Sequence, residues 1–234
     1  NQYHSSIDWW LNNTKVILPL PHNLLFVANT IDNFLMSSDV INGRGHEPHM
    51  IKKIIDFSQL GNTYVEVGAN YGDFALQVTS KIGSNGQIYA FEPGRTLFQC
   101  FDMSIKLNDI PNIVLENSAV SDKEQEIIFL ENKKISLASG IATEENDHTQ
   151  KSISITLDSY FKDKEASIDV LRLDAEGSEC KVLRGAEGII KSSPNIRLFI
   201  EWQLEFLSKH ESKDSMKKCL SSLTDKGFIF LDIL

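Results

Sequence analysis

The chain has 234 residues, of which 41% are hydrophobic, so it can bury one sizeable core, and we expect one domain with an appendage. Acidic side chains outnumber basic ones by 32 to 23, for a formal net charge of −9. Without a basic stripe a nucleic-acid partner is not expected. Three widely spaced cysteines form neither a disulfide framework nor a zinc pattern, and no apolar run reaches the ~18 residues of a membrane span. We therefore predict a cytoplasmic protein with no membrane span.

Residues 1–50 show little regular pattern and are predicted to form an extension that caps the core, which spans 51–234. Within the extension we expect a short helix, near Trp9, Trp10 and Leu11, and one or two small strands over 16–21 and 24–27. Pro48 is expected to open the first helix of the core, because proline is favoured at the first helical position.

From residue 63 the chain alternates between short apolar runs and helical patterns. Strands are predicted at 63–67, 87–91, 113–117, 169–173, 197–201 and 228–233, and helices near 74–82, 96–108, 178–191 and 212–226. Nearly continuous apolar strands separated by helices indicate an α/β fold: a doubly wound, mostly parallel sheet with helices on both faces. Residues 123–160 interrupt the alternation and are predicted to be an insertion, with extra strands at 126–130 and 152–157 around a polar loop or lid over 131–151.

The first strand of the sheet runs into a glycine loop with the pattern Glu66-x-Gly68-x-Asn70-x-Gly72. Glycine lets the backbone turn tightly and approach a ligand, and Ala69 lies within the same turn. Glu92 ends the next strand about 20 residues beyond the loop, where an acidic side chain can take both ribose hydroxyls of a nucleoside. The pair predicts a nucleoside-binding strand–loop–helix–strand unit.

The composition of this loop distinguishes two cofactors. A nicotinamide-binding loop needs G-x-G-x-x-G to cradle a pyrophosphate, whereas Asn70 stands at the second glycine here. A carboxylate at Glu66 repels a diphosphate but suits a cofactor that carries an ammonium and a sulfonium, which favours S-adenosylmethionine. Two rival readings stay open: an NAD-dependent oxidoreductase, for which no catalytic Tyr/Lys pair stands out, and a nucleoside-binding module without turnover.

Polar side chains also follow the later strands. Asn117 and Ser118, beside Ala119, are candidates to flank an adenine after the third strand, although a turn explains them about as well. After the fourth strand come Asp174, Glu176 and Glu179, of which Glu179 is read as a cap of the following helix.

Asp174 is predicted to face the transferred group, where it would orient a sulfonium, deprotonate a hydroxyl or ligate a divalent cation. Glu201 closes the fifth strand at the same edge, and His46 lies in a loop expected to reach over the cofactor as a candidate general base. No metal site is predicted, and a divalent cation held by Asp174 and Glu201 is left open.

With these residues assembled, the chain resembles the FkbM family of S-adenosylmethionine-dependent methyltransferases. The most distinctive match is D-x-E-G-x-E at 174–179, and G-H-E-P at 45–48 is similar to the usual lead-in. The matching pieces are 66–72, 91–93, 117–122, 156–158, 168–179, 182–186 and 200–201.

The resemblance implies a Rossmann-like class I methyltransferase fold and O-methylation of a sugar, glycolipid or polyketide-type acceptor. Residues 68–72 would face the methionine part of the cofactor, Glu92 would hold the ribose, and 117–119 would flank the adenine. A methyltransferase sheet normally has a seventh strand, and the chain stops inside its predicted sixth, which leaves truncation at this end open.

We therefore expect in-line transfer of a methyl group to a hydroxyl, with catalysis coming mostly from collinear alignment of oxygen, carbon and sulfur. Asp174 is the first candidate for the proton acceptor, followed by Glu176, Glu201 and His46. The acceptor pocket is expected from 1–50 and 131–160. Acceptor identity, metal dependence and oligomeric state do not follow from the sequence.

Overall fold

The structure is a computed structural model that describes residues 14–132, 135–136, 139–142, 144–146, 148–164 and 166–232, with backbone alone for residues 34 and 36. None of the helices in these ranges combines the length and apolarity that a bilayer crossing requires. The short helix expected near Trp9 lies outside the described residues.

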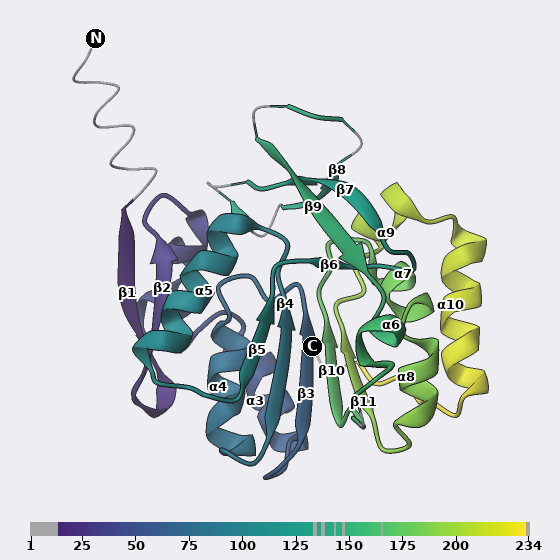
Figure 1. Ribbon diagram of the computed structural model, residues 1–234, viewed down its shortest axis with the longest axis horizontal. Coiled ribbons are helices and arrows are strands. Elements are labelled where there is room, and N and C mark those ends of the chain that lie inside the picture. Colours follow the sequence, from purple (N-terminus) through teal and green to yellow (C-terminus); the bar gives the residue numbers. More distant parts are fainter. Residues whose placement is uncertain are drawn as a thin grey trace.

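A parallel sheet of five strands forms the centre of the molecule, in the order β11-β10-β3-β4-β5 (Figure 1). The strands are β3 (Thr63–Val67), β4 (Gln87–Phe91), β5 (Ile113–Glu116), β10 (Val170–Leu173) and β11 (Arg197–Ile200). The chain order runs outward in opposite directions from the β3–β10 pair. Open α/β sheets bind ligands beyond the carboxyl ends of the strands at such a reversal, so the topology locates the site between β3 and β10.

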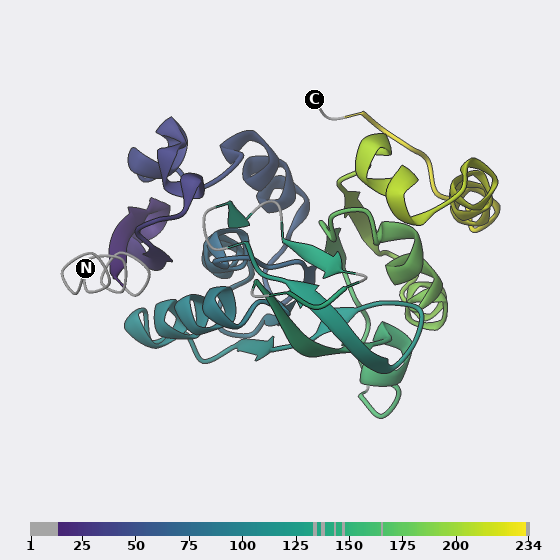
Figure 2. The same ribbon diagram turned by 90° about the horizontal axis from the view of Figure 1, so that it is seen from above.

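Helices cover both faces of the sheet, as seen from above in Figure 2. One face packs against α3 (Pro48–Phe57), α4 (Asp73–Ile82) and α5 (Arg95–Leu107), and the other against α6 (Leu157–Phe161), α7 (Glu179–Arg184), α8 (Glu187–Ser192) and α10 (Lys213–Asp225). Successive strand residues point to opposite faces, so Tyr64 joins the first core and Val65 the second. Burial on both sides explains why these strands are nearly continuous apolar runs.

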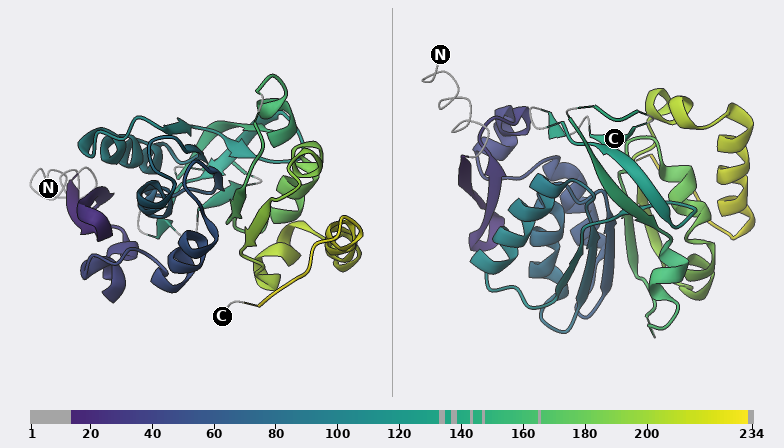
Figure 3. Two further views of the ribbon diagram at one scale, coloured as in Figure 1. Left: turned by 90° about the horizontal axis from the view of Figure 1, so that it is seen from below. Right: turned by 45° about the horizontal axis from the view of Figure 1, so that its top comes forward.

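An N-terminal hairpin packs beside α5 (Figure 3). It consists of β1 (Lys15–Leu20) and β2 (Leu24–Asn29), joined by a 3₁₀ turn, Pro21–Asn23, and confirms the predicted small strands. The Val27 amide donates to Ser104 Oγ at 2.8 Å, and the Leu25 amide donates to Asn108 Oδ1 at 2.8 Å, so side chains of α5 fix the hairpin. A second 3₁₀ turn, Asn33–Met36, and a short helix α2 (Ser38–Ile41) lead from the hairpin to α3.

A second sheet lies across the carboxyl ends of the central strands (Figure 1). Its strands have the order β6-β9-β7-β8, namely β6 (Ala119–Val120), β9 (Thr149–Ile155), β7 (Gln125–Leu130) and β8 (Gly140–Ala142). The two predicted extra strands correspond to β7 and β9 and are confirmed. The span 131–151, predicted to be a loop or lid, also contains β8 and the start of β9, because β8 pairs along β7.

Two predicted elements differ from the structure. The helix predicted over 178–191 is two helices, because the backbone leaves helical geometry at Gly185 (φ −77°, ψ 1°) and Ala186 (φ −120°, ψ 7°). Asp158 then accepts from the amides of Gly188 and Ile189 at 2.9 and 2.8 Å at the start of α8.

The strand predicted over 228–233 is wrong where the chain is described: 228–232 is irregular, and Ile229 and Leu231 are largely exposed. An apolar run forms a strand only when a neighbouring strand pairs with it. The helix α9 (Leu204–His210) was not predicted.

Candidate active site

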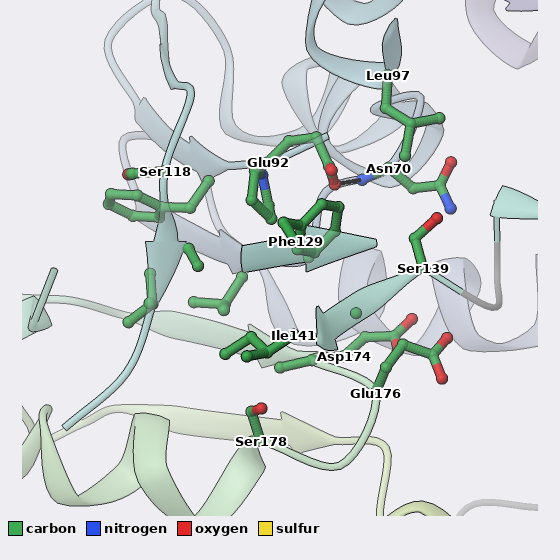
Figure 4. A pocket seen from close by; sticks show the side chains of 18 of the residues that line it. Asn70, Glu92, Leu97, Ser118, Phe129, Ser139, Ile141, Asp174, Glu176 and Ser178 are labelled. Carbon is green, nitrogen blue, oxygen red and sulfur yellow. Dashed lines mark hydrogen bonds between the residues drawn. The ribbon is translucent and has the colours of Figure 1, made fainter. Parts of the chain in front are cut away.

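A cavity opens at the carboxyl ends of β3, β4 and β10, where the sheet order reverses (Figure 4). Its lining atoms surround about 620 Å³ of space, part of it open to solvent. The central sheet and the loops after its strands contribute most of the polar lining. The opposite side is closed by Phe129 of β7, Gly140 and Ile141 of β8, and Ser136 and Ser139 between these strands. Of the predicted site residues, those that line the cavity are Gly68, Asn70, Glu92, Ser118, Ala119, Asp174 and Glu176.

The glycine loop after β3 is pressed against the loop after β10. Gly68 has a φ of 79°, and a Cβ there would fall 1.8 Å from the backbone carbonyl oxygen of Asp174. The amides of Gly68 and Ala69 both donate to the Phe91 carbonyl at 3.1 Å, which fixes the turn. Only glycine fits this position, and the contact brings the nucleoside loop and the acidic loop together.

Glu92 is buried at the end of β4. One carboxylate oxygen accepts from the Asn70 amide and the other from the Gly94 amide, each at 2.7 Å. Burial raises the pKa of Glu92 to about 8. Because each carboxylate oxygen has two lone pairs, both can still accept from a pair of ligand hydroxyls. The Asn117 side chain donates to the Glu92 carbonyl oxygen at 2.8 Å, so it stabilises the backbone at the end of β4.

Ser118 gives an independent sign of a ligand. It is buried, it lines the cavity, and its Oγ has no hydrogen-bond partner within the described part of the protein. Ser136, on the opposite wall of the cavity, likewise has a buried Oγ with no hydrogen-bond partner among the described residues. Buried hydroxyls are usually satisfied, so two serines of the cavity lining whose hydroxyls have no described partner fit a polar ligand such as a nucleoside. Together with the Gly68 turn and Glu92, the residues present fit S-adenosylmethionine.

A buried guanidinium organises the acidic edge of the cavity. Arg172, on β10, donates to Asp174 Oδ2 at 2.8 Å and to Glu66 Oε1 at 3.2 Å, and its guanidinium carbon lies 3.9 Å from the centre of the Phe74 ring. Glu66 is fully buried, and burial raises its pKa to about 8. The Glu66 carboxyl group therefore pairs with Arg172 of the protein itself and does not line the cavity. Its position does not support a direct contact with the sulfonium of the cofactor.

Three further glutamates surround Asp174. Glu176 lines the cavity with a left-handed backbone, at a φ of 49°, and burial, then repulsion from Asp174, raises its pKa to about 8. Glu201 shares a hydrogen bond with Asp174, and burial likewise raises the pKa of Glu201 to about 8. Glu179 accepts from the amides of Ala175 and Gly177 at 2.9 and 3.2 Å, which holds the loop that carries Glu176.

Other predicted residues lie just outside the cavity. The His46 amide donates to the buried Asp73 carboxylate at 2.6 Å, so the loop over 43–49 is anchored to the start of α4 through its backbone. His46 does not line the cavity, and neither do Ala69, Gly72 or Asn117. Within the described ranges no three His, Cys, Asp or Glu side chains are arranged to hold a metal ion.

Sequence reasoning assigned no role to Arg172, nor to Ser136, Ser139 and Ile141. Arg172 had a signal, because a charged residue inside the apolar run of β10 must find a partner when it is buried. Ser136, Ser139 and Ile141 had no such signal, since their place depends on how the second sheet and its connections fold over the first sheet.

Comparisons with known proteins place the chain in a family. The family model described as methyltransferase FkbM domain matches residues 66–230. No curated protein matches the chain. Among solved structures, fibrillarin from Aeropyrum pernix in complex with natively bound S-adenosyl-L-methionine has a TM-score of 0.47 at 13% identity, over 92% of this chain and 85% of that chain.

A second structure, precorrin-6y C5,15-methyltransferase from Geobacter metallireducens, has a TM-score of 0.45 at 10% identity, over 79% of this chain and 72% of that chain. These similarities are too low to carry an argument by themselves. The family match spans most of the chain and includes both the nucleoside loop and the acidic loop. The chain therefore belongs to the FkbM family of methyltransferases and has their Rossmann-like class I fold, with a doubly wound parallel sheet.

Proposed function

We propose that the protein transfers a methyl group from S-adenosylmethionine to a hydroxyl of a sugar, glycolipid or polyketide-type acceptor. One observation carries the proposal: the same cavity is lined by Glu92, a buried acid that suits a ribose, and by Ser118, whose hydroxyl has no described hydrogen-bond partner. Two further acids, Asp174 and Glu176, line it as well. When bound, the cofactor supplies an electrophilic methyl group on a sulfonium.

Two parts of the cavity have separate tasks. Glu92 and Ser118 would hold the nucleoside, with Glu92 accepting from the ribose hydroxyls. Asp174, fixed by Arg172, would place a negative charge beside the methionine part, close to the Gly68 turn. This arrangement favours a cationic ligand and fixes its orientation, which is where most of the rate acceleration of a displacement arises.

Glu176 is the strongest candidate for the proton acceptor. Its pKa of about 8 lies near neutral pH, where a general base is most effective, and its carboxylate lines the cavity. Asp174 is less suited to this task than the sequence suggests, because its carboxylate is already paired with the Arg172 guanidinium at 2.8 Å.

A neighbouring groove supports a hydroxylated acceptor. It is lined in part by Glu47, Arg172, Glu201 and Trp202, and Glu201 connects it to Asp174 through their shared hydrogen bond. Carboxylates accept from hydroxyl groups, and an aromatic face packs on the apolar faces of a ring. This combination suits a carbohydrate or a polyol.

The proposal is tested by methyl transfer from S-adenosylmethionine carrying a radiolabelled methyl group to a panel of glycosides, glycolipids and polyketide alcohols. The expected product is a labelled ether that is stable to mild base. Glu176→Gln should slow the transfer by roughly 10²- to 10⁴-fold, as expected for loss of a general base. Glu124→Gln, at an exposed position just before β7, is the matched control.

Two outcomes would contradict the proposal. Cofactor binding without label transfer to any acceptor would indicate a module without turnover. Label found in a base-labile ester or on nitrogen would exclude a hydroxyl acceptor.

A further inference from the structure

The N-terminal segment, which precedes the residues matched by the family model, contributes a buried carboxylate near the cavity. Asp32 follows β2 and is 1% exposed. Its Oδ2 accepts from the Tyr71 hydroxyl at 2.8 Å, and its Oδ1 accepts from the Ser136 amide at 3.1 Å. One side chain thus joins three segments that lie 39 and 104 positions apart in the sequence.

The first of these contacts acts on the nucleoside loop. Tyr71 stands between Asn70 and Gly72, and it is 1% exposed. The Asn70 amide is held by Glu92, so two consecutive residues of the loop are fixed by two different carboxylates, Glu92 and Asp32. Burial, then the charge of Asp32, raises the pKa of Tyr71, so its hydroxyl remains the donor.

The second contact acts on the opposite wall of the cavity. Ser136 lines the cavity together with Ser139, Gly140 and Ile141, which we call the covering residues. Ser139 and Ile141 face the side of the cavity formed by Asn70, Asp174 and Glu176 (Figure 4). The Ser136 Oγ is buried and has no hydrogen-bond partner among the described residues, and the bond from the Ser136 amide to Asp32 fixes the backbone that carries this hydroxyl.

From these contacts we infer that Asp32 is a positioning residue for cofactor binding, which holds the nucleoside loop and the covering residues at a fixed separation. The inference rests on the proposed function, because it takes the cavity to be the site of S-adenosylmethionine. Asp32 touches neither the cavity nor a reacting atom and acts through Tyr71 and Ser136.

Calorimetric titration of the full chain with S-adenosylhomocysteine tests this inference. Asp32→Ala removes both acceptors, and the affinity should fall about tenfold or more. Tyr71→Phe removes one hydroxyl, and the affinity should fall a few-fold, by about three to ten times. In the double variant the two losses should be less than additive, because both substitutions break the same contact. Asp32→Asn keeps an acceptor for the Ser136 amide and should recover part of the affinity.

The control is Asp39→Asn, in the same segment, where the carboxylate pairs with Arg44 on the surface and binding should be unchanged. A merely structural role for Asp32 would lower the melting temperature of the unliganded protein without changing the dissociation constant. Equal affinity of wild type, Tyr71→Phe and Asp32→Asn would overturn the inference even if Asp32→Ala failed to fold. Failure of the wild type to bind would overturn the proposed function itself, and this inference with it.

Discussion

At the residue scale, buried carboxyl groups determine which charges the site carries at a given pH. Glu66, Glu92, Glu176 and Glu201 each have a pKa raised to about 8, with burial as the largest cause. At neutral pH most of these groups are protonated, so Arg172 is balanced chiefly by Asp174. The site therefore presents one stabilised carboxylate beside protonated acids, rather than a repelling cluster of charges.

This electrostatic arrangement predicts the pH dependence of catalysis. Glu176 accepts a proton only when it is ionised, so the rate of methyl transfer should rise as the pH passes through about 8. The measurement is the turnover rate between pH 6 and 10 with saturating cofactor, beside Glu176→Asp, whose profile should shift. A wild-type rate that is independent of pH over this range would exclude Glu176 as the base.

Glu66 predicts a dependence of stability on pH. Its pKa in the folded protein is raised from 4.5 to about 8, so the folded state binds the proton more tightly than the unfolded state. This contribution to the free energy of unfolding is fully present below pH 4.5 and is lost as the pH rises through about 8. Glu66→Gln keeps an acceptor for Arg172 and should remove a slope of at most about 1.4 kcal/mol per pH unit.

Denaturant unfolding of wild type and Glu66→Gln at intervals from pH 5 to pH 8.5 measures that difference. Parallel curves for the two proteins would show that Glu66 titrates as it does in the unfolded chain.

The close approach of two loops defines the site at the scale of elements. Gly68 and Gly61 both have positive φ values, 79° and 84°, so alanine at either position carries similar backbone strain. A Cβ at Gly68 would also overlap the Asp174 carbonyl, whereas Gly61 has no atom within 4 Å of that point in the described structure. Gly68→Ala should cost about 1–3 kcal/mol more than Gly61→Ala and should weaken binding of S-adenosylhomocysteine.

Urea unfolding and ligand titration of both alanine variants check this expectation. Equal losses of stability would mean that the two loops separate readily and that their contact does not shape the cavity.

Elements with a strong local signal are the ones that the sequence predicts well. The five central strands are apolar runs buried on both faces, and each lies close to its predicted range. The break between α7 and α8 falls instead at Gly185, which packs against Ser121 from a distant segment, a contact that no local pattern shows. The apolar run at 228–232 lacks a pairing strand in the structure, and no local pattern reveals that.

At the scale of the whole molecule, the topology explains why much of the site was predictable. Carboxyl ends of parallel strands meet at one edge, so Gly68, Glu92 and Asp174 converge once the sheet forms. The orientation of Glu66 follows from strand alternation, which places its side chain on the same face of the sheet as Tyr64. Arg172 is its register partner on the neighbouring strand β10. Asp32 and Ser136 were not predictable, because their contact arises from the packing of the hairpin segment and the second sheet around the cavity.

The most direct test of the account is calorimetric titration of the purified chain with S-adenosylhomocysteine, with NADH as the competing ligand class. Wild type should bind the thioether nucleoside in the micromolar range and should not bind NADH. Glu92→Ala should weaken binding about 10- to 100-fold, because the hydrogen bonds to both ribose hydroxyls are lost, and Glu92→Gln should weaken it less. Binding of NADH, or an affinity for S-adenosylhomocysteine that Glu92→Ala leaves unchanged, would contradict the assignment of this cavity as the cofactor site.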